Sequence, residues 1–191
     1  MYTLSSGLWE KFFKKKDYYV VIIGLDNAGK TTFLEQTKSH FINDYGMLNP
    51  AKITATVGLN IGKVVLNNTC LNFWDLGGQE SLRDLWSTYY EDASALIFVV
   101  DATRRDLFPE IAKIFKEVIS HEPIQRVPVL VAVNKSEIEG AAPAAEVRLL
   151  LNDEDHRADF AVLPVSALEG TNIERCTRWI IQSLASQPIF L

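Results

Sequence analysis

Residues 18–31 read Tyr18-Tyr-Val-Val-Ile-Ile-Gly24-Leu-Asp-Asn-Ala-Gly29-Lys30-Thr31. The first six residues are β-branched or aromatic, which is typical of a buried strand, and this run stops at Gly24. A helical pattern then fits the residues from Thr31 to about Phe41. The stretch therefore predicts a strand, a turn that contains glycine and a helix in immediate succession.

The alternation of strands and helices continues along the chain. Residues 95–100 and 127–133 are continuous apolar runs, as in strands that are covered on both faces. Residues 160–165 resemble them more weakly, because Pro164 cannot donate to a strand ladder. Helical patterns fit three further segments, residues 105–121, 143–151 and 172–186.

Residues 58–66 and 69–75 are two extended segments that are joined at Asn67-Asn68. Asparagine tolerates positive φ, so this junction predicts a hairpin turn. Together the pattern predicts an α/β domain with a mainly parallel, six-stranded sheet, one antiparallel edge strand and helices on both faces.

The turn after the first strand matches the phosphate-binding pattern G-x-x-x-x-G-K-[ST], in the strand–helix context that the pattern requires. Lys30 is expected to reach the β- and γ-phosphates of a nucleotide, and the Thr31 hydroxyl to bind Mg²⁺. A glycine-containing turn with a stray lysine is the alternative, and the context disfavours it. The loop that would surround the phosphates contains Gly24, Leu25, Asp26, Asn27, Ala28, Gly29, Lys30, Thr31 and Thr32.

A second candidate site follows the apolar strand Leu71-Asn-Phe-Trp-Asp75. An aspartate at this point of a phosphate-loop protein holds Mg²⁺, usually through water. Gly78 is expected to offer its backbone N–H to a γ-phosphate. Gln79 can orient an attacking water, because its amide both donates and accepts hydrogen bonds.

Three motifs resemble the Arf/Arl family of small GTPases: Gly-Leu-Asp-Asn-Ala-Gly-Lys-Thr-Thr at 24–32, Thr-Val-Gly-Leu-Asn at 56–60 and Trp-Asp-Leu-Gly-Gly-Gln-Glu at 74–80. The resemblance implies one small GTPase domain that binds GTP or GDP and Mg²⁺, cycles between the two nucleotide states and hydrolyses GTP slowly. By this match Thr56 binds Mg²⁺ in the GTP state, and Leu59, Trp74 and Tyr89 receive effectors. Ordinary core packing is the alternative for that triad. The family also implies an exchange factor, an activating protein and a register shift of the 58–75 hairpin between states.

The base-reading motifs contain one departure from the family pattern. Asn134-Lys135-Ser136-Glu137 resembles the guanine motif Asn-Lys-x-Asp, with glutamate in the place of aspartate. The carboxylate would accept hydrogen bonds from guanine N1–H and N2–H₂, a donor pair that adenine lacks. The last guanine motif is matched by Ser166, Ala167 and Leu168.

Residues 1–16 differ from the rest, because they contain four lysines and a single glutamate in a chain of net charge -5. Their aromatic and apolar residues fall on one side of a helical wheel, so we expect an amphipathic arm on an anionic membrane, followed by the GTPase domain at 17–191. A helix permanently docked on the domain is the alternative. Myristoylation is not expected, because Tyr2 stands where glycine is required.

The start of the chain and the run Lys30–Lys38 look most like the ADP-ribosylation factor-related members of the family. That likeness implies a cytoplasmic protein that associates peripherally with Golgi and trans-Golgi membranes in the GTP state. A Golgi membrane receptor is one candidate partner there. The acidic pI of about 5.2 argues against a nucleic-acid partner.

Two other classes of function are alternatives for this sequence. A non-cycling, nucleotide-bound scaffold with relaxed base specificity stays open because of Glu137. A small-molecule kinase is disfavoured, since the sequence offers neither an acceptor site nor an arginine-rich lid.

Overall fold

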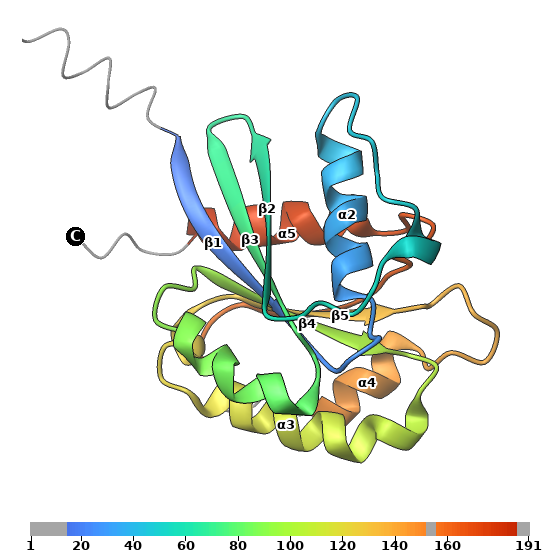
Figure 1. The fold of residues 1–191 in the computed structure, drawn as a ribbon. Helices are drawn as coiled ribbons and strands as arrows, with labels where there is room; N and C mark the ends of the chain where they lie inside the picture. Colours follow the sequence, from blue (N-terminus) through green and yellow to red (C-terminus); the bar gives the residue numbers. More distant parts are fainter. Residues whose placement is uncertain (1–14, 152–155, 187–191) are drawn as a thin grey trace, which may run out of the picture.

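The computed structural model describes residues 15–151 and 156–186, and it contains one mixed sheet (Figure 1). The strand order is β2-β3-β1-β4-β5-β6, in which β2 runs antiparallel to β3 and all other neighbours are parallel. The predicted six-stranded sheet with one antiparallel edge strand is therefore confirmed. The strands are β1 (Lys16–Ile23), β2 (Leu59–Leu66), β3 (Thr69–Leu76), β4 (Ala95–Asp101), β5 (Val129–Asn134) and β6 (Phe160–Pro164).

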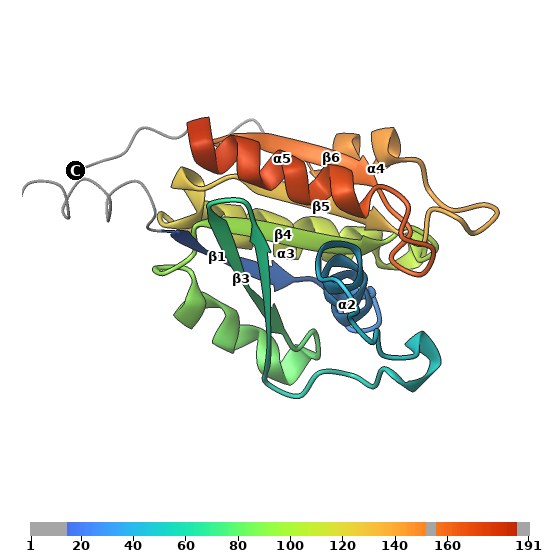
Figure 2. The ribbon, with the colours of Figure 1, turned by 90° about the horizontal axis from the view of Figure 1, so that it is seen from above.

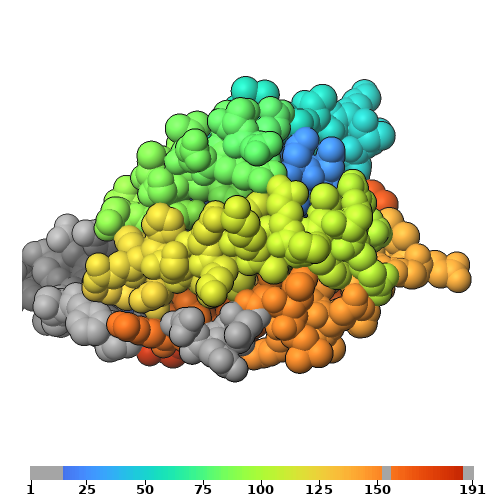
Figure 3. Space-filling model, turned by 90° about the horizontal axis from the view of Figure 1, so that it is seen from below, coloured from blue at the N-terminus to red at the C-terminus, as the bar shows by residue number. Residues whose placement is uncertain are grey.

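Helices cover both faces of the sheet, as Figures 1 and 2 show. On one face, α2 (Lys30–Phe41) and α5 (Ile173–Ser186) pack over alternate residues of the strands. On the other face lie the 3₁₀ helix η2 (Glu80–Tyr89), α3 (Phe108–Ser120) and α4 (Ala144–Leu151). In Figure 3, α3 crosses the middle of this second face between the η2 region and α4. Two hydrophobic layers thus fix the sheet from either side.

Some element boundaries differ from the sequence-based ones. The helix expected at 105–121 begins as a short 3₁₀ turn at Arg105–Leu107, and α3 starts only at Phe108, with a proline in its first turn. The strand expected from residue 127 starts at Val129, after Pro128, which has no N–H for a ladder. Pro164 is tolerated because it occupies the last position of β6. Three 3₁₀ segments were not predicted: the short turns Pro50–Lys52 and Ile124–Arg126, and the longer Glu80–Tyr89.

The amphipathic arm predicted at 1–16 lies almost wholly outside the described residues, and β1 already includes Lys16. Within the described ranges, none of the helices has the length and apolar character needed to cross a bilayer. The carboxyl ends of β1, β3, β4 and β5 point to one edge of the sheet, where α/β proteins bind their ligands. The predicted residues at 24–32, 75–79 and 134–137 lie at or just after the carboxyl ends of β1, β3 and β5, whereas Thr56 precedes β2 and residues 166–168 follow β6.

Candidate nucleotide and metal site

The loop between β1 and α2 has a backbone that only glycine accommodates at two positions. Gly24 has φ +142, and a Cβ there would lie 2.2 Å from the carbonyl oxygen of Val99. Gly29 has φ +93, and its Cβ would lie 2.2 Å from Asn134 Nδ2. The loop therefore packs directly on β4 and on the end of β5, and it leads into the N-terminus of α2, where backbone N–H groups favour an anion.

Lys30 supplies a buried cation at this helix N-terminus. Its Nζ donates to the carbonyl oxygens of Gly24, at 3.0 Å, and Leu25, at 2.9 Å. Burial lowers the pKa of Lys30, while the nearby Asp75 and Asp26 act in the opposite direction. A Cβ on Gly78 would lie 2.4 Å from Lys30 Nζ, so the Gly78 backbone approaches the same point. This combination suits the negatively charged end of a phosphate chain.

Beside the lysine, three segments bring oxygen atoms together. Thr31 Oγ1 donates to Asp75 Oδ2 at 2.7 Å and lies 2.8 Å from Thr56 Oγ1. The same Oδ2 also accepts from Thr56 Oγ1, at 3.4 Å, and from Asn60 Nδ2, at 3.2 Å. Oxygen atoms are the ligands that Mg²⁺ prefers.

Asp75 is fully buried, and burial raises the pKa of its carboxyl. Its other oxygen, Oδ1, is also buried and has no hydrogen-bond partner within the described part of the chain. An unpaired buried carboxylate oxygen is costly unless a ligand, ion or water satisfies it. Among residues 15–151 and 156–186, no three His, Cys, Asp or Glu side chains converge on a metal position. The residues therefore fit Mg²⁺ held by hydroxyls, phosphate oxygens and water rather than by a carboxylate cage.

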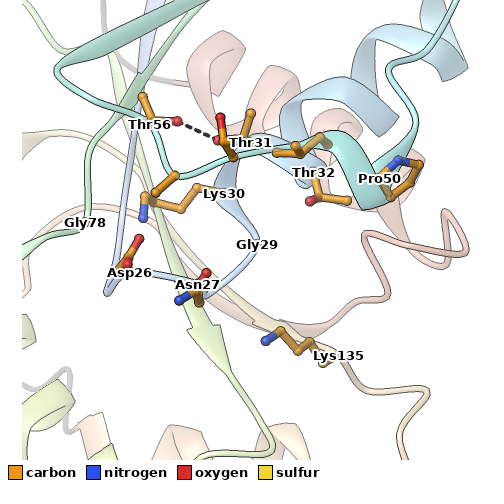
Figure 4. A pocket seen from close by; sticks show the side chains of 13 residues that line it. Asp26, Asn27, Gly29, Lys30, Thr31, Thr32, Pro50, Thr56, Gly78 and Lys135 are labelled. Carbon is orange, nitrogen blue, oxygen red and sulfur yellow. Dashed lines mark hydrogen bonds between the residues drawn. The ribbon is translucent and has the colours of Figure 1, made fainter.

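Lys30, Thr31, Thr56 and Gly78 line one pocket (Figure 4), whereas Asp75 does not belong to the lining formed by the described residues. Lys30, Thr31 and Thr56 lie together on one side, and Lys135 approaches from a separate segment. The predicted residues in its lining are Asp26, Asn27, Gly29, Lys30, Thr31, Thr32, Thr56, Gly78 and Lys135. The sequence reading missed Pro50, Ile53, Thr54 and Ala55, which form a further wall. Their position just before Thr56 was the only available signal.

The base-reading segment is tied to the phosphate loop by Asn134. Its Nδ2 donates to the Ala28 carbonyl oxygen at 2.8 Å, and its Oδ1 accepts from the Ala167 N–H at 2.9 Å. Lys135 pairs with Asp101, the last residue of β4. The sequence analysis did not identify Asp101 as part of this site. The predicted motifs at 24–32, 134–137 and 166–168 thus meet through one buried amide.

Glu137 is half-buried, and its Oε2 is a buried atom without a hydrogen-bond partner in the described ranges. An acceptor in this condition fits a ligand that brings N–H donors. Ser166 is buried and Leu168 is 58% exposed.

Gln79 is half-buried at the start of η2, directly after Gly78, but it does not belong to the pocket lining formed by the described residues. Of the proposed effector residues, Leu59 begins β2, Trp74 lies on β3 and Tyr89 ends η2. The Trp74 and Tyr89 rings are in contact, with centroids 5.5 Å apart, and Leu59 is 36% exposed. These three side chains are available at the surface or half-buried.

Comparison with known proteins agrees with this geometry. The model of the ADP-ribosylation factor family matches residues 4–184. The chain is 41% identical over 185 residues to ADP-ribosylation factor-related protein 1 of Rattus norvegicus, covering 95% of this chain and 92% of that protein. It is 37% identical to ADP-ribosylation factor-like protein 3 of Saccharomyces cerevisiae, over 96% of this chain and 94% of that protein.

A solved structure is also similar. The Arl6 BBS3 small GTPase of Trypanosoma brucei, with the bound nucleotide analogue GppNp, matches with a TM-score of 0.79 and 30% identity, over 91% of this chain and 100% of that one. Its fold and the family match lead to the same conclusion. The chain belongs to the ADP-ribosylation factor family of small GTPases.

Proposed function

We propose that this member of the family is a cycling switch that binds GTP with Mg²⁺, recruits effectors at Golgi and trans-Golgi membranes, and releases them after hydrolysis. As a small GTPase of this family it binds and hydrolyses GTP. The observation that carries the proposal is the convergence of the Thr31, Thr56 and Asp75 oxygens beside Lys30.

Each group has a role that follows from its position. Lys30 and the amides of the phosphate loop bind the β- and γ-phosphates, and the Gly78 N–H donates to a γ-phosphate oxygen. Thr31 and Thr56 would hold Mg²⁺ through their hydroxyls, and Asp75 through water. When bound, the ion neutralises charge on the β- and γ-phosphates. Gln79 orients the attacking water.

Thr56 is the residue that would distinguish the two states. Its hydroxyl lies 2.8 Å from that of Thr31, the arrangement expected when a triphosphate is bound. After loss of the γ-phosphate, Thr56 would no longer bind the Mg²⁺ ion, and the 58–75 hairpin would slide along β1. Such a discrete shift is a bistable element of the kind that switches use. Leu59, Trp74 and Tyr89 would then change the surface that effectors bind.

Guanine specificity is proposed to survive the change from aspartate to Glu137. The Glu137 Oε2 atom, which has no hydrogen-bond partner among the described residues, supports this, because guanine N1–H and N2–H₂ would supply the missing donors. A non-cycling scaffold with relaxed base choice is the alternative, and the departure at Glu137 alone favours it.

The cellular role rests on the relatives and on the sequence of the arm. An exchange factor, an activating protein and effectors would be the partners, and a Golgi membrane receptor would be a further one. Residues 1–16 would supply the membrane contact in the GTP state. In the GDP state the protein would be in the cytoplasm.

Hydrolysis itself tests the switch. Arginine supplied by an activating protein accelerates GTP hydrolysis by about 10³–10⁵-fold. We expect very slow single-turnover hydrolysis by the isolated protein and strong acceleration by a Golgi extract that contains such a partner. Gln79→Leu should keep the GTP form under both conditions, because the water is no longer oriented. Fast hydrolysis by the isolated wild-type protein, or unchanged acceleration in Gln79→Leu, would contradict the proposal.

A further inference from the structure

Glu35 is a buried carboxylate that none of the nucleotide-binding steps above uses. It lies on α2, one turn after Thr31, and is 2% exposed. Burying a carboxylate is costly unless charged and hydrogen-bonding partners compensate. Such partners are present, because Lys38 forms an ion pair with Glu35 and the Tyr45 hydroxyl donates to Glu35 Oε2 at 2.8 Å.

Two further contacts extend this cluster into the loop after α2. The Leu48 N–H donates to the same Oε2 at 3.4 Å, and Lys38 Nζ lies 4.7 Å from the centre of the Tyr45 ring. Lys38 thus contacts both the carboxylate and the ring. Residues 45–48 are therefore attached to α2 at several points, although Leu48 itself is 56% exposed.

The attached residues lead directly to the pocket wall. Asn49 accepts from the Ala51 N–H at 2.9 Å and begins the 3₁₀ turn Pro50–Lys52. Pro50 and residues 53–55 then line the pocket, and Thr56 reaches Thr31 at the next position. The segment is held at two ends, by Glu35 at one and by the Thr31–Asp75 cluster at the other.

We propose that Glu35 and Tyr45 are positioning residues that clamp residues 45–48 to α2, and that this clamp keeps the 50–55 wall and Thr56 closed over a bound triphosphate. The inference rests on the proposed nucleotide function and adds to it a determinant of how long GTP is retained. Glu35 touches no nucleotide in this account. It acts through the loop, whose freedom would otherwise oppose the Thr56 contact.

The clamp is tested by the release of a fluorescent, non-hydrolysable GTP analogue and of fluorescent GDP, each chased with excess unlabelled nucleotide in the presence of Mg²⁺. Tyr45→Phe removes one hydroxyl and leaves the ring that contacts Lys38. Hydrogen bonds to charged groups are strong enough to change a rate by about tenfold or more, so we expect the GTP analogue to leave roughly five- to tenfold faster. GDP release should change less, because Thr56 would contact the Mg²⁺ site only in the triphosphate state.

Two further variants sharpen the result. Glu35→Gln removes the charge of the carboxylate that accepts from Tyr45, so it should accelerate release at least as much. The acceleration in the double variant should be smaller than the product of the two single accelerations, because both changes weaken the same interaction. Tyr18→Phe is the matched control, since Tyr18 is a half-buried tyrosine on β1 outside the clamp. It should release both nucleotides at the wild-type rates.

Unchanged release of the GTP analogue from both Tyr45→Phe and Glu35→Gln would overturn the clamp. Equal acceleration of GTP-analogue and GDP release would also overturn it, because general loosening of the fold would then explain the effect. Thermal melting of each nucleotide-bound variant monitors that loosening. A wild-type protein that retains neither nucleotide would refute the proposed function itself, which separates the two failures.

Discussion

Glu137 is, at the scale of one residue, the departure from the guanine motif, and we propose that it keeps the chemistry of the expected aspartate. Glutamate has the same charge as the expected aspartate, and the buried Oε2 of Glu137 has no hydrogen-bond donor among the described residues. We expect GTP to outcompete ATP strongly, and Glu137→Asp to leave GTP affinity unchanged or to raise it. Competition between labelled GTP and unlabelled ATP measures this directly.

Glu139→Asp is the control for that experiment, because Glu139 is an exposed glutamate of the same loop. Displacement of GTP by an equal concentration of ATP from the wild-type protein would mean that base specificity has been lost. A non-cycling, nucleotide-bound scaffold with relaxed base specificity would then be the better account of the function.

Asp101 makes the stability of the base-reading loop dependent on pH. Burial raises the pKa of this carboxyl, but hydrogen bonds from Lys135 and Thr103 outweigh it and bring the pKa below its ordinary 3.8. A lowered pKa adds stability above the unfolded-state value, and that stability is lost as the pH falls through the folded-state value. Asp101→Asn should therefore be less stable near neutral pH and lose less stability on acidification.

Urea unfolding of both proteins between about pH 6 and about pH 3 provides the comparison. Asp106→Asn is the control, because Asp106 pairs with Arg104 at the surface, where such pairs contribute little. Parallel acid dependence of wild type and Asp101→Asn would exclude the stabilising role of the Lys135 pair.

At the scale of elements, the strands were predictable because apolar runs and the glycine turn carry strong local signals. The mainly parallel sheet followed from the strand–helix alternation, whereas the order of the strands in it was not predicted. The 3₁₀ helix η2 was not predictable, because Glu80–Tyr89 mixes polar and apolar residues and Trp86 becomes buried only against other elements. The pocket wall at 50–55 was missed for the same reason, since the distant Glu35 holds the segment before it.

The candidate phosphate site was more predictable than the residues that contact its side chains. Lys30, Thr31 and Asp75 stand in motifs whose chemistry requires those residue types. Asn60 and Asp101 act through long-range contacts with Asp75 and Lys135, and nothing in the local sequence connects these pairs.

The hairpin offers an element-scale test of the proposed slide. Asp17 on β1 is the register partner of Cys70 on β3. Neighbouring strands lie about 4.8 Å apart, within the range that a disulfide can bridge. Oxidised Asp17→Cys should therefore lock the register in which Thr56 meets Thr31, and raise the preference for a GTP analogue over GDP by about tenfold.

The reduced form of Asp17→Cys and the double variant Asp17→Cys/Cys70→Ser are the controls, and mass spectrometry measures the extent of cross-linking. If the fully cross-linked protein binds GDP and the GTP analogue with the same relative affinities as the reduced form, the hairpin does not slide between states.

At the scale of the whole molecule, the arm at 1–16 is proposed to couple the nucleotide state to a membrane. One short amphipathic helix binds lipid weakly, so a second contact is expected to be needed. Full-length protein and residues 17–191, each loaded with GDP or a non-hydrolysable GTP analogue, can be sedimented with Golgi membranes. Only the full-length protein with the GTP analogue should sediment strongly. Equal sedimentation of all four samples would refute both the role of the arm and its control by nucleotide.

The central claim, that the pocket between β1 and α2 retains a guanine nucleotide through Lys30 and its neighbours, is tested most directly by identifying what the purified protein carries. The protein is denatured, and the released nucleotide is separated by chromatography and identified by mass. We expect close to one GDP or GTP per wild-type chain, and none on Lys30→Ala, because losing charged hydrogen bonds to two phosphates should weaken binding by about 100-fold or more. Recovery of adenine nucleotide, or of equal guanine nucleotide from wild type and Lys30→Ala, would contradict the claim.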